Sequence, residues 1–88
     1  MPRASKPAPG PLSLEVASLL RAEMGRQSLS KSELARRAHL DRTMVSDIVR
    51  GLQRADVEDL DSICQALGIS LTEVLSKAEQ ESDARRLV

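Results

Sequence analysis

Hydrophobic residues recur along this chain at helical spacing, in short segments separated by polar residues and glycines. Between residues 57 and 67 the apolar side chains fall three or four positions apart, the stripe of an amphipathic helix, and Gly68 then ends it. No segment alternates apolar and polar residues with the period of two that a half-buried strand shows. The pattern therefore predicts an all-α fold, a compact five-helix bundle. The other helices are expected from an N-cap at Ser13 to about Met24, with Gly25 as the end, and over 31–38, 42–50 and 71–78.

Capping signals mark where three of these helices begin. Ser30 and Glu33 form a capping box, in which the serine oxygen accepts from the backbone amide of Glu33 while the glutamate reaches back. Asp41 is expected to cap the helix that follows, and Gly51 to close it. The segment 70–73, Ser-Leu-Thr-Glu, is a second capping box. These signals fix the helix starts more firmly than the apolar spacing alone.

The helices 31–38 and 42–50 are joined by a short turn at residues 38–40, which is the layout of a DNA-reading helix-turn-helix. Their apolar positions fall where two helices that cross at a steep angle must touch. The remaining face of the second helix is polar and able to form hydrogen bonds, as the reading of base edges requires. That face carries Arg42, Thr43, Ser46, Asp47 and Arg50.

Composition removes several classes of function. The chain has 88 residues and no Phe, Trp or Tyr, so it cannot recognise single strands by stacking bases on aromatic rings. Cys64 is the only cysteine and His39 the only histidine, so no zinc-ligand set and no thiol-imidazole pair can be assembled. We expect neither an enzyme nor a bound cofactor. No apolar run is long enough to span a membrane, and we expect a cytoplasmic protein.

The formal net charge is zero, but the charges are unevenly distributed. Seven basic and three acidic residues lie between positions 26 and 54, whereas 55–76 holds five acidic residues and no Lys or Arg. This separation predicts a cationic side that faces DNA and an anionic side that faces away.

All four prolines lie within the first eleven residues, together with Arg3 and Lys6. Residues 1–11 are therefore interpreted as a flexible basic arm, 12–78 as the helix-turn-helix domain and 79–88 as a C-terminal tail, because the apolar pattern fades beyond Glu79. The arm is either a leader without a task or a segment that follows DNA.

From about Leu14 to Leu75 the chain resembles the Cro/C1-type (Xre-like) helix-turn-helix family of bacterial and phage repressors. The resemblance rests on three phrases in this order and spacing: 29–35, Leu-Ser-Lys-Ser-Glu-Leu-Ala; 42–51, which ends in Arg-Gly; and 60–71, which contains Ala-Leu-Gly-Ile-Ser-Leu. It implies a lambda-repressor-like domain that binds double-stranded DNA as a dimer.

Two positions depart from the family pattern. His39 stands in the turn where the family usually has glycine, so we expect a slightly strained left-handed residue there. Val49 stands where many members have a glutamate that pairs with an arginine of the first helix. We therefore expect a buried apolar contact in its place and assign no pairing role to Arg21.

The resemblance also implies roles for individual residues. Base edges in the major groove would be met by Arg42, Thr43, Ser46 and Asp47. DNA phosphates would be bound by Lys31, Arg50, Gln53 and Arg54. A two-fold dimer interface is expected at Leu71, Val74 and Leu75.

Two functions from different classes remain open. The first is a sequence-specific regulator, a repressor that binds a pseudo-palindromic operator as a homodimer and acts by occluding polymerase. The second is a protein-interaction module, or the antitoxin of a toxin-antitoxin pair, that binds a partner protein through residues 57–78 or the C-terminal tail. A pure adaptor has no reason to keep Arg42, Ser46 and Arg50 beside Lys31, and for that reason we prefer the first. Any one of Arg36, Arg37 and Arg54 is equally well interpreted as a solubilising charge.

Overall fold

A computed structural model describes the backbone of residues 7–86 and the side chains of residues 7–83. This part of the chain contains helices and no strand, which confirms the prediction of a five-helix, all-α fold. The helices are α1 (Pro11–Gln27), α2 (Lys31–Ala38), α3 (Arg42–Val49), α4 (Val57–Leu67) and α5 (Leu71–Arg86).

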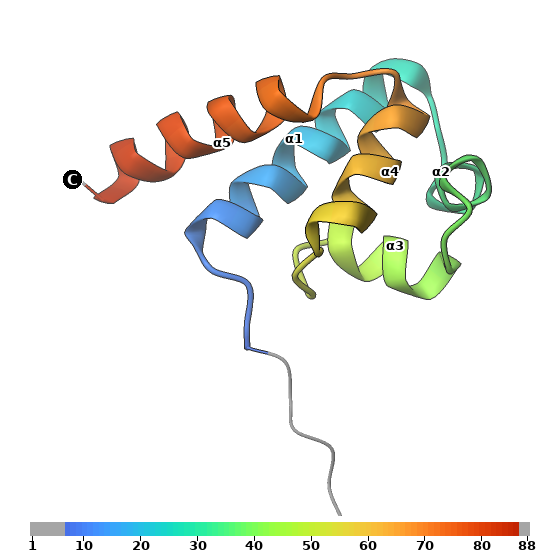
Figure 1. Ribbon diagram of the computed structural model, residues 1–88, viewed down its shortest axis with the longest axis horizontal. Helices are drawn as coiled ribbons and strands as arrows, with labels where there is room; N and C mark the ends of the chain where they lie inside the picture. Colours follow the sequence, from blue (N-terminus) through green and yellow to red (C-terminus); the bar gives the residue numbers. More distant parts are fainter. Residues whose placement is uncertain (1–6, 87–88) are drawn as a thin grey trace, which may run out of the picture.

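The longest two helices, α1 and α5, pack side by side and run in opposite directions (Figure 1). The shorter helices α2, α3 and α4 lie together below them in this view, with α3 at the edge of the molecule farthest from α5 (Figure 1). This arrangement leaves α3 with one side against the bundle and the other free.

Aliphatic side chains from all five helices meet in one core. Leu20 of α1, Leu34 of α2 and Ile63 of α4 are fully buried, as are Val45 and Val49 of α3. Burying a side chain of this size contributes roughly 1.5–3 kcal/mol, so the two valines fasten α3 firmly to the bundle.

The predicted caps are present. The Ser30 hydroxyl accepts from the Glu33 amide at 3.1 Å, and the Asp41 carboxylate accepts from the Met44 amide at 3.0 Å. The Ser70 hydroxyl does the same for Glu73 at 3.2 Å. The Glu33 side chain differs from the prediction, because its carboxylate binds the arginines one turn ahead where we expected it to reach back to Ser30. A stronger partner, a guanidinium, has displaced the reciprocal half of the capping box.

The predicted ends of α1 are wrong. The helix begins at Pro11 after Gly10, before the expected cap at Ser13, because proline suits the first position of a helix. It runs through Gly25 and ends when Ser28 adopts a left-handed conformation with φ 53°. The amide of Leu29 then donates to the carbonyl of Met24 at 2.9 Å, which closes the end.

Helix α5 continues past Ala78, where the sequence pattern predicted its end, to Arg86. Val74, Ala78 and Ser82 are buried and spaced four residues apart, so they form one stripe. Because the last of them is a serine, the hydropathy pattern did not reveal the final turns. Pro11 and residues 79–86, which the sequence placed in the arm and the tail, are helical, and residues 1–6 and 87–88 lie outside the described part.

Candidate nucleic-acid interface

The first turns of α2 and α3 border a polar groove of about 350 Å³ on the outer face of the bundle. It gathers six of the eight residues to which the sequence assigned DNA contacts, four for bases and two for phosphates, and adds one neighbour that the sequence interpretation missed, Ser32. The residues that line it are Lys31, Ser32, Arg42, Thr43, Ser46, Asp47 and Arg50.

Helix α3 presents this polar face because its other face is fixed in the core. Val45, Ile48 and Val49 are buried, and the Asp41 cap satisfies an amide at the start of the helix. The polar positions between them are left toward solvent: Arg42 and Thr43 are exposed, while Ser46, like its neighbour Asp47, is partly buried. The result is a rigid helix with one hydrogen-bonding side.

The turn before α3 has the predicted geometry. His39 is left-handed with φ 58°, and its amide donates to the carbonyl of Arg36 at 3.3 Å. The amide of Leu40 donates to the carbonyl of Ala35 at 3.0 Å. These bonds end α2 and set the crossing of α2 and α3 that opens the groove.

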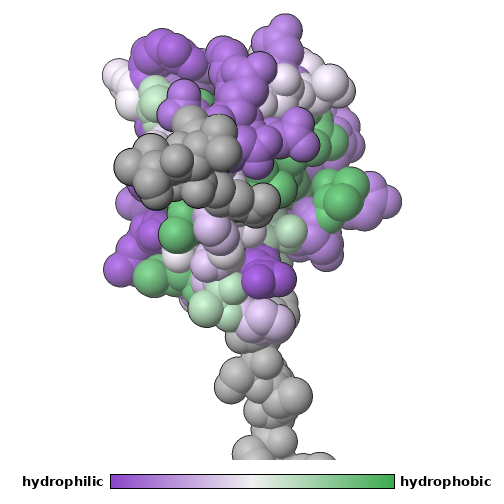
Figure 2. Space-filling model, turned by 90° about the vertical axis from the view of Figure 1, so that its left-hand side faces the viewer, coloured by the Kyte–Doolittle hydropathy of each residue, from purple (hydrophilic) through white to green (hydrophobic). Residues whose placement is uncertain are grey.

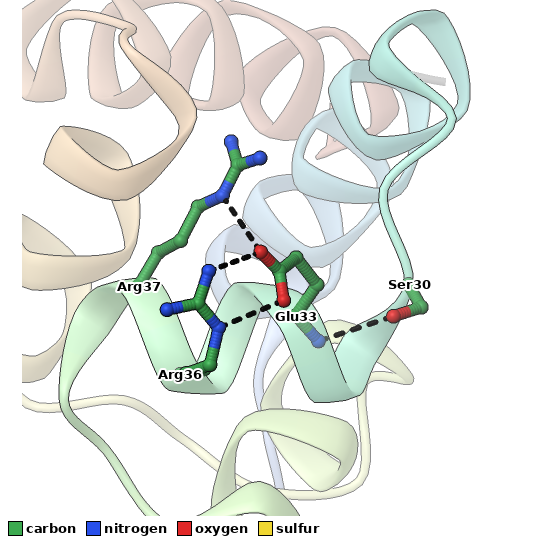
Figure 3. Close-up of polar contacts among 4 residues, drawn as sticks. All are labelled: Ser30, Glu33, Arg36 and Arg37. Carbon is green, nitrogen blue, oxygen red and sulfur yellow. Dashed lines mark hydrogen bonds and ion pairs between the residues drawn. The ribbon is translucent and has the colours of Figure 1, made fainter.

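Arg36 and Arg37 lie outside the groove, where both bind Glu33 (Figure 3). The Nε of Arg36 donates to Glu33 at 2.9 Å, and the Nε of Arg37 lies 3.4 Å from the same carboxylate. The hydrogen bond from Arg36 lowers the pKa of the Glu33 carboxyl from its usual 4.5 to about 2. Glu33 therefore offsets one of these two positive charges within α2.

Gln53 and Arg54 follow α3 and do not line the polar groove. Gln53 lines a different, apolar groove. The Nε of Arg54 donates to the backbone carbonyl of Ala8 at 3.0 Å. The structure therefore separates these two predicted phosphate contacts from the other six residues.

Arg21 has a role that the sequence interpretation denied it. Its guanidinium donates from α1 to the carbonyl of Val49, the last residue of α3, at 2.6 Å. The family's usual ion pair is thus replaced by a bond to the backbone as well as by burial of the Val49 side chain. A carbonyl at a helix end needs such a partner, because it has none within the helix.

The residues predicted for a dimer interface do not share one environment. Val74 is buried in the core of the monomer, Leu71 is half-buried and Leu75 is 37% exposed. Leu71 and Leu75 line an apolar groove of about 170 Å³ together with Leu12 of α1 and Val57 of α4. Hydrophobic side chains also reach the surface at the end of the molecule where α1 begins and α5 ends (Figure 2).

Cys64 is buried on α4, and burial raises the pKa of its thiol to about 11, with the Asp61 charge adding to the effect. A thiol held protonated is a poor nucleophile. Within the described part of the chain, no helix combines the length and apolar character that crossing a bilayer requires.

Comparison with known proteins identifies the family to which this fold and this groove belong. The family model described as helix-turn-helix matches residues 20–74, which include α2, α3 and the turn between them. The chain belongs to the Cro/C1-type helix-turn-helix family. Its fold and family are those of DNA-binding transcriptional regulators. No curated protein is recognisably similar to this family member in sequence.

Solved structures of related regulators share the fold. The clp gene regulator ClgR from Corynebacterium glutamicum is 27% identical, with a TM-score of 0.76 over 92% of this chain and 85% of that one. The restriction-modification controller protein C.AhdI from Aeromonas hydrophila is 26% identical, with a TM-score of 0.66 over 70% and 94% of the two chains. A variant of the controller protein C.Esp1396I bound to its highest-affinity operator site OM is 22% identical, with a TM-score of 0.73 over 83% and 96%.

Proposed function

We propose that this chain is a sequence-specific regulator that reads double-stranded DNA with α3 in the major groove. The observation that carries the proposal is the polar groove, in which four predicted base contacts and two predicted phosphate contacts come together on the exposed side of α3. The major groove is about 12 Å wide and admits one helix. Family membership supports binding to DNA, and a controller protein that shares the fold is bound to an operator site.

The side chains of α3 suit base readout. Arg42 is exposed at the first position of the helix, where its guanidinium can donate two bonds to O6 and N7 of a guanine. Thr43 and Ser46 can donate to or accept from either base type. Asp47 suits the amine of a cytosine, or it orients the arginines that line the same groove.

Lys31 and Arg50 line the same groove, and we assign them to DNA phosphates beside it. Ser32 joins Lys31 at the first turn of α2, where the helix dipole favours an anion. We keep Gln53 as a flanking phosphate contact. These groups set the affinity and the register, and α3 sets the sequence choice.

We infer that the protein binds as a homodimer on a pseudo-palindromic site with half-sites about 34 Å apart. A two-fold interface needs a self-complementary patch. The apolar groove provides such a patch, because exposed Leu12, Val57 and Leu75 lie beside its hollow. In a two-fold pair, each copy can place these side chains in the groove of the other. Its lining includes Ile48 and Gln53 near the end of α3, so two copies joined there bring their reading helices to neighbouring half-sites.

The regulatory effect we propose is repression. A protein seated in the major groove at a promoter excludes polymerase from the same base pairs, which requires no contact with a further protein. ClgR is described as a regulator of the clp genes, which supports a role in transcription for a chain of this fold.

Selection of bound duplexes from random-sequence DNA, followed by a salt titration on the recovered motif, tests the proposal. We expect one motif with two-fold symmetry. Arg42→Ala should relax the choice of one base pair by about 1–3 kcal/mol, roughly 5- to 150-fold, because it removes a bidentate contact. Lys31→Ala should weaken every duplex alike and reduce the slope of log K against log salt by about 0.9.

Arg26→Ala is the matched control, since it removes an exposed arginine from the far end of α1. It should leave both the motif and the slope unchanged. Recovery of no motif, or equal and sequence-blind losses for Arg42→Ala and Lys31→Ala, would contradict the assignment.

A further inference from the structure

Arg54 lies in the loop between α3 and α4, and its side chain makes a contact that its two neighbours do not. Gln53 and Ala55 both line the apolar groove, whereas Arg54 does not. The Nε of Arg54 instead donates to the backbone carbonyl of Ala8 at 3.0 Å, across 46 positions of sequence. The loop is therefore bonded to the segment from which α1 starts.

Two further contacts join the loop to the start of α1. A Cβ on Gly10 would lie 3.9 Å from a terminal nitrogen of the Arg54 guanidinium, so the guanidinium lies against the residue before the first turn of α1. A Cβ on Gly51, at the end of α3, would lie 3.2 Å from Cδ2 of Leu14, and its φ of 75° also favours glycine. The start of α1 and the loop after α3 thus lie side by side (Figure 1).

These two segments form neighbouring walls of the apolar groove. The first turn of α1 supplies Leu12 and Ser13, and the loop supplies Gln53 and Ala55. Residues 53–55 lie between helices, where no helical hydrogen bonds fix their distance from α1. The side chain of Arg54 fixes that distance, because it holds the middle of this stretch against the segment before α1.

We propose that Arg54 is a positioning residue for the homodimer, whose bond to Ala8 keeps the apolar groove in the shape that a second copy of this chain fills. The proposal rests on the proposed function, since it needs the two-fold pair inferred there. It replaces the phosphate contact that the sequence assigned to Arg54, because the Nε is engaged by Ala8 and the residue lies outside the polar groove. A groove that is already ordered in the monomer loses less chain entropy when the second copy binds.

Substitutions at position 54 separate the hydrogen bond from the charge. A glutamine side chain places its amide nitrogen where arginine has Nε, so Arg54→Gln keeps a donor for the Ala8 carbonyl and loses the charge. Arg54→Met has the same length up to that atom and no donor. Sedimentation of the full chain over a concentration series gives the dimer dissociation constant. Arg54→Met should raise it roughly 2- to 10-fold, the effect of one lost hydrogen bond, and Arg54→Gln should leave it unchanged.

Binding to a duplex with a single half-site supplies the second measurement, because one monomer occupies it. Affinity and the slope of log K against log salt should be the same there for the wild type and both variants, whereas loss of a phosphate contact would lower the slope by about 0.9. A general loss of folding would weaken half-site binding as well. Arg26→Met, which removes an exposed arginine near the other end of α1, is the matched control and should change neither measurement.

An unchanged dissociation constant for Arg54→Met overturns the proposal. Equal increases for Arg54→Met and Arg54→Gln also overturn it, since they assign the effect to the charge, and a lower half-site slope restores the phosphate contact. If the wild type stays monomeric with and without the two-fold site, the inferred homodimer is wrong and the role of Arg54 is lost with it. A motif that still depends on Arg42 would in every one of these cases leave the reading of DNA by α3 intact.

Discussion

At the scale of single residues, the bond from Arg21 to the carbonyl of Val49 is the contact that most directly holds the end of α3. Replacing Arg21 by Met keeps the aliphatic stem but removes the donor, which leaves a helix-end carbonyl without its partner. We expect a loss of about 1 kcal/mol in the free energy of unfolding, measured by urea denaturation. DNA affinity should fall as well, because Arg50, the next residue after Val49, is one of the proposed phosphate contacts and loses its fixed position.

Arg26→Met is the matched control on the same helix. Arg26 is exposed and pairs with Glu23 one turn away, an interaction that solvent screens and that therefore adds little to stability. Equal losses for the two variants would show that the Arg21 bond contributes nothing beyond a surface pair.

The Arg21 contact also shows why sequence reasoning failed at this residue. The partner is a backbone carbonyl 28 positions away, and no side-chain pattern announces it. Many family members have a glutamate at this position that would have indicated a partner for Arg21, but this chain has Val49 there. The caps at Ser30 and Asp41 were predictable because donor and acceptor are three residues apart.

Cys64 yields a prediction with a defined sign. The fold raises its thiol pKa from 9.0 to about 11. A raised pKa means that the protonated thiol is favoured in the folded state, so its contribution to stability is complete below pH 9.0 and is lost as the pH rises toward 11. Urea denaturation at a pH below this window and at a pH above it should show a larger fall in the free energy of unfolding for the wild type than for Cys64→Ala. The same dependence in both proteins would contradict the assignment.

At the scale of elements, the capped starts of α2, α3 and α5 and the end of α4 at Gly68 followed local chemistry, but both ends of α1 and the end of α5 did not. The end of α1 is set by contacts beyond the helix: Gln27 of its last turn donates to the carbonyl of Leu67 at the end of α4, at 2.7 Å. The end of α5 is set by packing of Ala78 and Ser82 against its neighbours. Neither contact can be predicted from the spacing of apolar residues.

The left-handed residue in the turn between α2 and α3, His39, is a position where glycine should increase stability. An L-residue in this region costs roughly 1–2 kcal/mol, while glycine loses about 0.5–1 kcal/mol more chain entropy on folding. His39→Gly should therefore raise the free energy of unfolding by up to about 1 kcal/mol without changing DNA binding, since His39 does not line the polar groove.

Gly68→Ala is the converse variant. Gly68 has φ 71° at the end of α4, and a Cβ there would meet nothing within 4 Å, so only the conformational cost is added. The variant should lose about as much stability as His39→Gly gains. Opposite signs in thermal or urea unfolding are expected, and a loss in both would show that the His39 side chain stabilises the turn.

At the scale of the whole molecule, the sequence predicted which residues the helix-turn-helix brings together, but not where the loop after α3 lies. Six of the eight residues assigned to DNA lie in one groove because they share two adjacent helices whose crossing the caps and the turn determine. Gln53 and Arg54 follow α3 in a loop, where no periodicity fixes direction. The contact of Arg54 with Ala8 depends on how α1 packs, which only the folded chain reveals.

The apolar groove leads to a prediction about assembly. Val57 is 72% exposed at the first position of α4 and borders the hollow, so Val57→Glu places a charge in the proposed interface. The fold should tolerate it, because an acidic side chain is favoured in the first turn of a helix. Light scattering should show a monomer in place of a dimer, with weaker binding to the two-fold motif and little change for a single half-site.

Leu52→Glu is the comparison, because Leu52 is also exposed, at 57%, but does not line the groove. A dimer that survives Leu52→Glu and dissociates with Val57→Glu places the two-fold contact at the groove between α1, α4 and α5. Dissociation by Leu52→Glu alone would instead place it on the loop after α3, and the inferred dimer would have to be rebuilt with the reading helices closer together.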